Sequence, residues 1–301
     1  MAAHPTDTPA PYRPAPGEPL PHQLLSALAQ HRMATTAQLH TMLRPNAARQ
    51  TVSIPLNNLR RKDLVAFTVL PRSHRTRAWY LTPEGARLTR DHPTQRGRPP
   101  YPITAATAAS LKTPHTLTTV RCHLAFAADA RHHGHEHGPL DWTPEVSHPL
   151  GDGQRLITDA LMHYTRTHGQ QRTKLRAFIE VDRTTMSSER LAAKLIDYAR
   201  LFLYEAQPAG RRRPTTPGPA WLRHYPVFPR ILFILTGATP TRLNNRISDL
   251  QAMTGQHPLV ATLAHNVPLG AATLDDLEQH SPSADIWTPL TGGQRRAWNE
   301  L

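Results

Sequence analysis

The stretch KLRAFIEVDRTTMSSERLAAKLIDYARLFL, residues 174–203, decides how the rest of the chain is interpreted. It opens as an apolar run that predicts a strand, and this run ends in the acids Glu180 and Asp182. Ser187 or Ser188 can then cap a helix, because the apolar residues that follow recur at helical spacing. The segment therefore predicts a buried strand that ends in acid and leads directly into a helix.

The two acids of this strand are expected on one face of it. Side chains alternate along a strand, so Phe178, Glu180 and Asp182 share one side, while Ile179 and Val181 share the other. Neighbouring carboxylates on an apolar strand destabilise the fold unless cations or hydrogen bonds compensate their charge. The strand therefore needs a cation or hydrogen-bond donors close by.

A second apolar run, residues 156–162, contains one acid, Asp159. Its distance in sequence from Glu180 suits two adjacent strands of a hairpin, joined by the polar and basic residues 168–174. In such a hairpin Asp159, Glu180 and Asp182 are expected to converge at one place. The sequence thus predicts a cluster of three carboxylates.

This arrangement resembles the PD-(D/E)XK nuclease fold, in which an acid on one strand and an acid-x-lysine on the next hold a divalent cation. The dipeptide ending in Asp159 stands where that family has Pro-Asp, and residues 180–182 stand where it has (D/E)-x-K, so Asp182 occupies the lysine position. The resemblance implies that Asp159 and Glu180 bind Mg²⁺ or Mn²⁺. It also implies catalytic roles for Asp159, Glu180 and Asp182, with Lys194 of the following helix as the replacement for the missing lysine.

Three short segments indicate a narrower family than the nuclease fold does: residues 158–160, 178–183 and 189–195. They resemble the replication-relaxation family of actinobacterial and Firmicute mobile elements, and the resemblance extends over roughly residues 22–265. It implies a DNA-associated role in plasmid-type replication or transfer.

The composition favours a polyanionic partner. The formal net charge is +13 and the pI is about 10.8. Only four of the 35 Lys and Arg residues are lysine, and a high-GC genome produces such arginine-rich usage in any protein. Charge and motif together therefore predict double-stranded DNA as the partner, and charge alone is the weaker argument.

The cysteine content and the lengths of the apolar runs indicate the cellular compartment. The single cysteine, Cys122, cannot form an internal disulfide and is expected to be a small core residue. No apolar run approaches the roughly 18 residues that a membrane span needs, and the N-terminus has no apolar signal-peptide core. We expect a cytoplasmic, nucleoid-associated protein without membrane contact. Whether it forms a homodimer or binds a replication or transfer protein is left open.

The chain divides into five parts. Residues 1–20 are rich in proline and predict a disordered arm, whereas residues 21–90 predict a winged helix-turn-helix of three helices and two strand-like runs around a basic tip. Residues 91–102 predict a proline- and arginine-rich linker. Residues 103–265 are expected to form the nuclease-like domain, and residues 266–301, with weak periodicity, a C-terminal tail or docking segment.

The larger domain is expected to be of the α/β or α+β class, like a restriction endonuclease. Residues 116–130 and 242–253 have helical periodicity, and residues 142–150 and 231–235 are strand-like. Residues 259–263 are predicted as a last strand. Strands joined by helices imply a mixed central sheet that is flanked by helices.

The DNA contacts are expected on the third helix of the winged unit, which presents polar residues to base edges, and on the basic tip, which contacts phosphate. Pro55 is costly within a helix, so we place Ser53 at the N-cap and begin the recognition helix near Ile54. An alternative is that this unit pairs with another protein. The expected contacts are Arg49, Gln50, Ser53, Asn57, Arg60, Arg61, Arg72, His74, Arg75 and Arg77.

Four histidines lie within residues 132–137. Histidine is the commonest metal ligand, but these residues have no helical or strand spacing, so a solvated turn is predicted and not a zinc site. A relaxase would place His-apolar-His on a strand. Here Gly134 and Glu136 take the middle positions, which argues against that class.

Two functions remain open. In the first, the winged helix brings a metal-dependent nuclease-like domain to DNA, which that domain cleaves or nicks. In the second, the nuclease fold is degenerate and the protein is a non-catalytic DNA-binding regulator of transcription, replication or transfer. Glu180, Asp182 and Arg183 would then form a structural ion-pair cluster.

Overall fold

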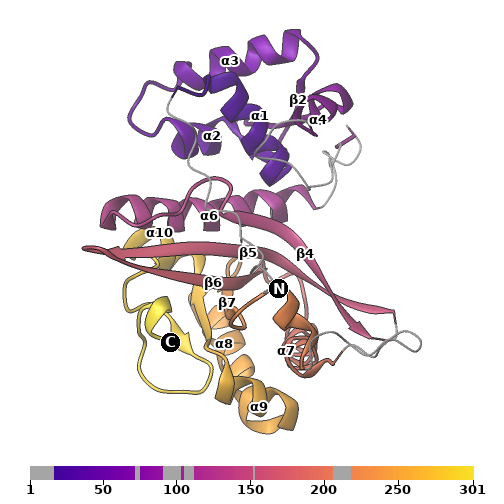
Figure 1. Ribbon diagram of the computed structural model, residues 1–301, viewed down its shortest axis with the longest axis vertical. Helices are drawn as coiled ribbons and strands as arrows, with labels where there is room; N and C mark the ends of the chain where they lie inside the picture. Colours follow the sequence, from indigo (N-terminus) through magenta and orange to yellow (C-terminus); the bar gives the residue numbers. More distant parts are fainter. Residues whose placement is uncertain (1–16, 72–74, 91–102, 105–111, 152, 206–217) are drawn as a thin grey trace, which may run out of the picture.

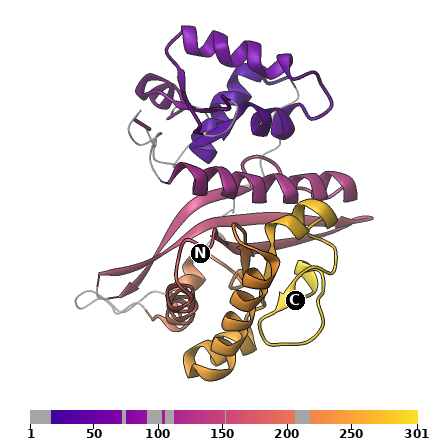
Figure 2. The ribbon, with the colours of Figure 1, turned by 180° about the vertical axis from the view of Figure 1, so that it is seen from behind.

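The computed structural model describes residues 17–71, 75–90, 103–104, 112–151, 153–205 and 218–301. It shows a mixed α+β protein, as predicted, in which an N-terminal unit lies on one side of the long helix α6 (Thr113–His133) and a central sheet on the other (Figures 1 and 2). Most of the predicted arm and the whole predicted linker lie outside the described residues. Among the helices that are described, none combines the length and the apolar character needed to cross a membrane.

The N-terminal unit, residues 20–90, contains helices and a small antiparallel sheet of strand order β1-β3-β2. Thr35 caps the second helix through a capping box with Gln38. The order of the elements is the one that the winged-helix prediction requires, and the assignment itself stays a prediction. The elements are α1 (Leu20–His31), β1 (Met33–Thr35), α2 (Thr36–Leu43), α3 (Gln50–Arg61), β2 (Val65–Val69), β3 (Arg77–Leu81) and α4 (Pro83–Arg90).

Helix α3 begins earlier than predicted. It starts at Gln50, so Ser53 is not its cap, and Pro55 lies inside the helix. A proline there removes one backbone hydrogen bond and costs about 3 kcal/mol. Val52, Leu56 and Leu59 are buried on one face at helical spacing. Their burial in the core of the unit explains why the helix extends through the proline.

The central sheet has the strand order β4-β5-β6-β7-β8-β9 within the described residues. The predicted hairpin is confirmed: β5 and β6 are antiparallel, with Ala160 opposite Ile179. The strands β6, β7 and β8 run parallel, and the other neighbours run antiparallel. Their bounds are β4 (Trp142–Gly151), β5 (Gln154–His168), β6 (Gln171–Asp182), β7 (Arg230–Leu235), β8 (Leu269–Thr273) and β9 (Thr288–Pro289).

Helices cover both faces of this sheet. On one face, α6 and α10 (Leu274–His280) pack on a core that includes Ile179 and Val181. On the other, α7 (Ser188–Leu203), α8 (Pro240–Gln256) and α9 (Pro258–Asn266) surround Phe178. The predicted alternation of faces along β6 is therefore confirmed. Cys122 is fully buried in the α6 core, as expected for a structural cysteine.

Two predictions for the C-terminal part are wrong. Residues 259–263 are not a strand but part of α9, which begins at a proline and buries Val260 and Leu263, spaced at i and i+3. Residues 266–301 are not a tail, because they supply β8, β9 and α10 and bury Trp287 and Trp298 completely. The short, small-residue strand β8 has no strong pattern of its own. Its pairing with β7 and β9 stabilises it.

Candidate functional site

The candidate site is centred on Glu180, where β6 passes beneath α7. Glu180 is only 3% exposed. One carboxylate oxygen accepts a hydrogen bond from the Tyr198 hydroxyl at 2.5 Å, and the other lies 2.8 Å from Lys194 Nζ. Lys194 and Tyr198 are one helical turn apart on α7, so both side chains face the strand. Lys194 therefore contacts Glu180, and its expected role as the replacement for the missing lysine stays a prediction.

Asp159 reaches the same place from β5. The register places it opposite Glu180, one step beyond the pair Ala160 and Ile179. Its Oδ2 accepts a hydrogen bond from the backbone N–H of Val181 at 2.7 Å, and its Oδ1 lies 3.1 Å from His115 Nε2. Helix α6 supplies this histidine from the opposite face of the sheet. Nothing in the sequence distinguishes His115 from other isolated histidines, and only the packing of α6 identifies it.

The charges of this cluster influence one another. Burial raises the pKa of Glu180 to about 8, and the negative charge of Asp159 adds to this effect. Burial also acts against ionisation of Asp159, but the hydrogen bond and charge of His115, with the charge of Lys194, outweigh it and lower the pKa of that carboxyl. Burial opposes the charge on Lys194 too, yet the two carboxylates raise the pKa of its ammonium group. One ammonium group thus interacts with both carboxyl groups.

Asp182 does not join this cluster. It is 1% exposed, and its Oδ2 accepts from the guanidinium of Arg246 on α8 at 2.6 Å, while its Oδ1 accepts from Thr184 N–H at 2.9 Å. The expectation of three converging carboxylates is therefore wrong. At this point α8 covers the strand, and a buried carboxylate requires a charged partner. Across the described parts of the chain, no three His, Cys, Asp or Glu side chains are placed to hold a metal ion.

Asp159 and Glu180 nevertheless fit the minimum requirement for Mg²⁺ or Mn²⁺. Mg²⁺ is often held by one or two carboxylates, while waters and substrate phosphate fill the remaining positions. The Asp159 side chain is 20% exposed, so a phosphate can approach it. Lys194 competes with such an ion, because its ammonium already contacts Glu180. Two carboxylate ligands suit an ion that also binds a phosphate and water, and they are too few to enclose an ion by protein groups alone.

The predicted DNA contacts lie on α3 and on the β2–β3 hairpin. Arg49, Gln50, Arg60, Arg61, Arg75 and Arg77 are exposed, and Ser53 and Asn57 are half-buried. Arg72 and His74 lie outside the described residues. The structure thus places the described members of this set on two neighbouring elements, with their side chains wholly or partly accessible.

An aromatic residue that the sequence analysis missed joins the two elements. The guanidinium groups of Arg77 and Arg60 lie 4.4 Å and 5.2 Å from the ring centre of Phe67 on β2. Arg77 also donates a hydrogen bond to the side-chain oxygen of Asn57 at 3.4 Å. Cation–π contacts orient guanidinium groups at a surface. The helix and the hairpin therefore present one continuous basic surface, defined by Asn57, Arg60, Phe67 and Arg77.

The histidines of residues 132–137 do not form one solvated turn. His132 and His133 end α6, whereas His137 is buried, and burial lowers its pKa to about 4. The prediction of a solvated turn is wrong for His137, whose Nδ1 hydrogen bonds with the carbonyl of His163 at 2.7 Å. The prediction that these histidines hold no zinc stays a prediction.

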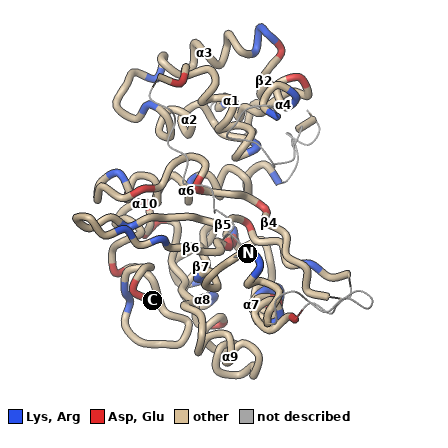
Figure 3. The backbone as a smooth tube through the Cα atoms, in the orientation of Figure 1, with Lys and Arg blue, Asp and Glu red and all other residues tan. Residues whose placement is uncertain are grey.

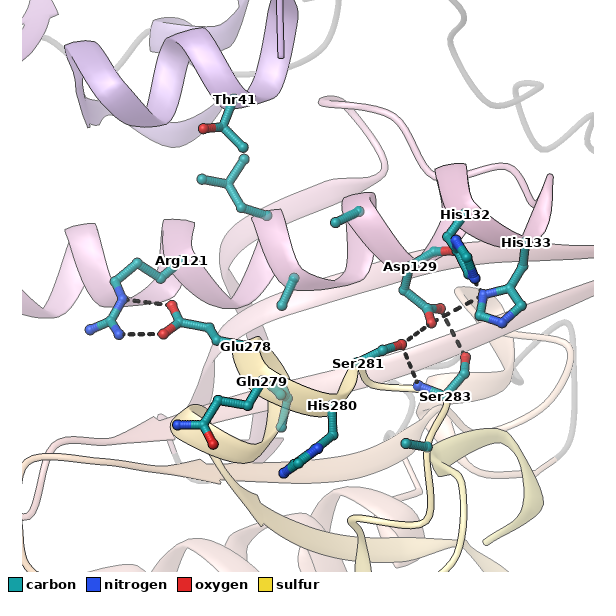
Figure 4. Close-up of a pocket in the computed structure, with 15 residues that line it drawn as sticks. Thr41, Arg121, Asp129, His132, His133, Glu278, Gln279, His280, Ser281 and Ser283 are labelled. Atoms are coloured by element: carbon teal, nitrogen blue, oxygen red, sulfur yellow. Dashed lines mark hydrogen bonds and ion pairs between the residues drawn. The ribbon is translucent and has the colours of Figure 1, made fainter. Parts of the chain in front are cut away.

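A cavity of about 690 Å³ lies between α6 and α10, with Thr41 of α2 at its rim (Figure 4). In its wall, the buried carboxylate of Asp129 accepts hydrogen bonds from Tyr164 at 2.7 Å, from Ser283 at 2.8 Å and from Ser281. These contacts satisfy the carboxylate and attach residues 281–283 to α6. Their role is structural, and they give a further reason why the C-terminal segment is not a tail.

Comparison with known proteins identifies a family for this chain. The sequence profile of replication-relaxation proteins matches residues 25–215 of the 301 residues. No curated protein and no solved structure matches the chain. The matched region includes the N-terminal unit, α6, the hairpin that carries Asp159 and Glu180, and α7. Because the match covers more than half of its length, the chain belongs to the replication-relaxation family.

Proposed function

We propose that this protein binds double-stranded DNA in the replication or transfer of a plasmid or another mobile element. Membership of the replication-relaxation family associates the chain with the replication or relaxation of mobile elements. The observation that supports DNA binding is the basic surface of Asn57, Arg60, Phe67 and Arg77, which connects α3 with the β2–β3 hairpin. In this proposal the N-terminal unit is a winged helix, and α3 is its recognition helix.

The chemistry of α3 suits the major groove of DNA. An α-helix fits that groove, and the exposed side-chain amide of Gln50 can bind the edge of an adenine through two hydrogen bonds. The arginines of helix and hairpin can contact phosphates on either side and position the helix. Phe67 holds two of these guanidinium groups in place, which lowers the entropic cost of ordering them on DNA.

The experiment is a titration of the full chain into a fluorescent duplex at several salt concentrations. Replacing Arg60 or Arg77 by Ala should weaken binding to all sequences and lower the slope of log affinity against log salt by about 1, because one phosphate contact is lost. Arg242→Ala is the matched control, because this exposed arginine lies on α8 and not on the basic surface. Wild-type affinity in both surface variants would show that DNA is bound elsewhere or not at all.

Metal-dependent cleavage or nicking of DNA is a second candidate function. It is supported by the juxtaposition of Asp159, Glu180 and Lys194. Asp159 and Glu180 would hold Mg²⁺ or Mn²⁺, which supplies an activated water and neutralises charge on the reacting phosphate. Tyr198 holds the Glu180 carboxylate in place, and Lys194 adds a positive charge where a phosphate oxygen would lie.

This candidate is tested by thermal melts with and without Mn²⁺, together with nicking of a supercoiled plasmid. The wild type should melt at a higher temperature with Mn²⁺ and should nick the plasmid, whereas Asp159→Asn should do neither. The matched control is Asp249→Asn, an acid of α8 that is separate from the cluster. If the wild type shows neither effect, the chain is a binding protein without this activity. A shift in melting temperature without nicking would indicate a site that binds metal but does not cut.

A further inference from the structure

The hairpin that carries the two acids also projects beyond the sheet at its other end. The pairing of β4 with β5 ends at Met162, and the pairing of β6 with β7 begins at Ala177. Residues 163–168 and 171–176 pair only with each other over most of their length and form a two-stranded ribbon. Figure 1 shows this ribbon extending past the end of α6, and Figure 2 shows the same projection from behind.

The ribbon is strongly basic. Residues 163–176 include three arginines and one lysine and contain no Asp or Glu (Figure 3). Arg172, Lys174 and Arg176 are spaced by two residues, so they lie on one face of the strand, about 7 Å apart along it. On the same face, Thr167, Thr165 and His163 lie opposite them on β5.

Most of this charge is not compensated by the protein. Arg172 pairs with Glu136 at 2.6 Å, and it is the one Lys or Arg of the ribbon with a carboxylate partner in the described part of the chain. Lys174 is exposed and Arg176 is half-buried. Like charges along one face repel one another, and exposed ion pairs add little stability. Folding alone therefore does not account for this row of cations.

The ribbon is nevertheless held in a defined position. The backbones of Glu136 and Thr165 exchange two hydrogen bonds of 2.9 Å, and the Thr167 N–H donates to His135 Nδ1 at 3.2 Å. The histidine-rich segment after α6 thus lies along the edge of the ribbon. A rigid arm loses less conformational entropy when a ligand binds it.

We propose that this ribbon is a second DNA-binding element, separate from α3 and its hairpin, and that its ligand is the backbone and major groove of duplex DNA. A two-stranded ribbon fits the major groove, and its cations can neutralise phosphates on both sides. The inference rests on the proposed function for its ligand, and it concerns a different part of the molecule.

The test uses the full chain and the same duplex titration. The double variant Lys174→Gln/Arg176→Gln should weaken binding about tenfold at moderate salt and lower the salt slope by about 2, because two phosphate contacts are removed. The control Arg242→Gln should bind as the wild type does. Circular dichroism and thermal melts check the fold, and the single variant Lys174→Gln, at an exposed position, should lower the slope by about 1.

The two proposals fail differently. If Arg60→Ala weakens binding and the ribbon variants bind like the wild type, the ribbon is not a DNA contact, and the proposal for α3 stands. A ribbon that binds an acidic protein instead would give that same result. If the ribbon variants lose affinity and Arg60→Ala does not, DNA is bound by the ribbon, and the assignment to α3 is wrong. A wild-type chain without affinity for duplex DNA would overturn both.

Discussion

Glu180 and Asp182 carry the same chemical group on the same face of β6, two residues apart, and both are buried. Asp182 has one cationic partner, Arg246 of α8, and the guanidinium side chain is only 6% exposed. Glu180 shares the ammonium of Lys194 with Asp159, and the Lys194 side chain is 22% exposed. The first pair is balanced and closed. The second cluster has two carboxyl groups for one ammonium and a route to solvent.

This difference shows that the covering helix decides what a carboxylate does. Under α8 the acid is neutralised by a buried guanidinium and serves the fold. Under α7, burial raises the pKa of Glu180, and this carboxyl group lies beside a second acid, Asp159. Two neighbouring carboxyl groups with a shifted pKa are typical of a site that binds a cation. Three substitutions distinguish the two sites.

The largest effect is expected at the closed pair. Arg246→Met should lower the free energy of unfolding by about 3–5 kcal/mol, because Asp182 would remain buried without its partner. Chemical denaturation measures the loss. The double variant Asp182→Leu/Arg246→Met should recover much of the stability, since no unpaired charge remains. A loss below about 1 kcal/mol in the single variant would mean that water reaches Asp182, and that the pair is not closed.

A smaller, pH-dependent effect is expected at Glu180. Burial raises its pKa from the ordinary value of 4.5 to about 8 in the folded protein. Between pH 4.5 and pH 8 the folded state therefore binds one proton more than the unfolded state. The stability from this group is complete below pH 4.5 and falls by up to about 1.4 kcal/mol per pH unit as the pH rises towards 8. Glu180→Gln should remove this decline, as denaturation at a series of pH values would show.

Other titrating groups also change the free energy of unfolding with pH. The difference in pH dependence between the wild type and Glu180→Gln is therefore the quantity to compare. Burial lowers the pKa of His137 and of His148 to about 4, and these groups make stability rise with pH between about 4 and 6.5. The control variant is Glu84→Gln. The hydrogen bond with Arg87 lowers the pKa of Glu84, so this group changes stability only at more acidic pH. Equal pH slopes in wild type and Glu180→Gln would contradict the assignment.

The smallest effect concerns competition between Lys194 and a metal ion. Lys194→Met leaves Asp159 and Glu180 without their ammonium, so Mn²⁺ should stabilise this variant more than the wild type. At tenfold excess over its Kd the ion adds about 1.4 kcal/mol, or about 4 °C in Tm. Thermal melts measure it, and adding Asp159→Asn should abolish the gain. Identical Mn²⁺ responses in Lys194→Met and wild type would show that the ammonium does not occupy the position of the ion.

Local patterns in the sequence were sufficient for several elements. The alternation along β6, the hairpin with β5, the Ser187 cap of α7 and the one-turn spacing of Lys194 and Tyr198 all depend on residues close in sequence. Lys194, expected to replace the missing lysine of the motif, lies close to Glu180 because its helix follows the strand directly, and its catalytic role stays a prediction. Periodicity and capping are local properties, and they do not require the rest of the fold.

The partners of the acids were decided by the tertiary structure. Arg246 reaches Asp182 from 64 residues away, and His115 reaches Asp159 from a helix on the other face of the sheet. The small-residue strand β8 likewise forms only because β7 and β9 pair with it. The free energy of such contacts comes from burying groups that are remote in sequence, so no local pattern encodes it. Local sequence patterns therefore place acids at the end of the central strand, whereas the packing of α6, α7 and α8 sets which acid pairs with a buried arginine and which lies beside Asp159 and Lys194.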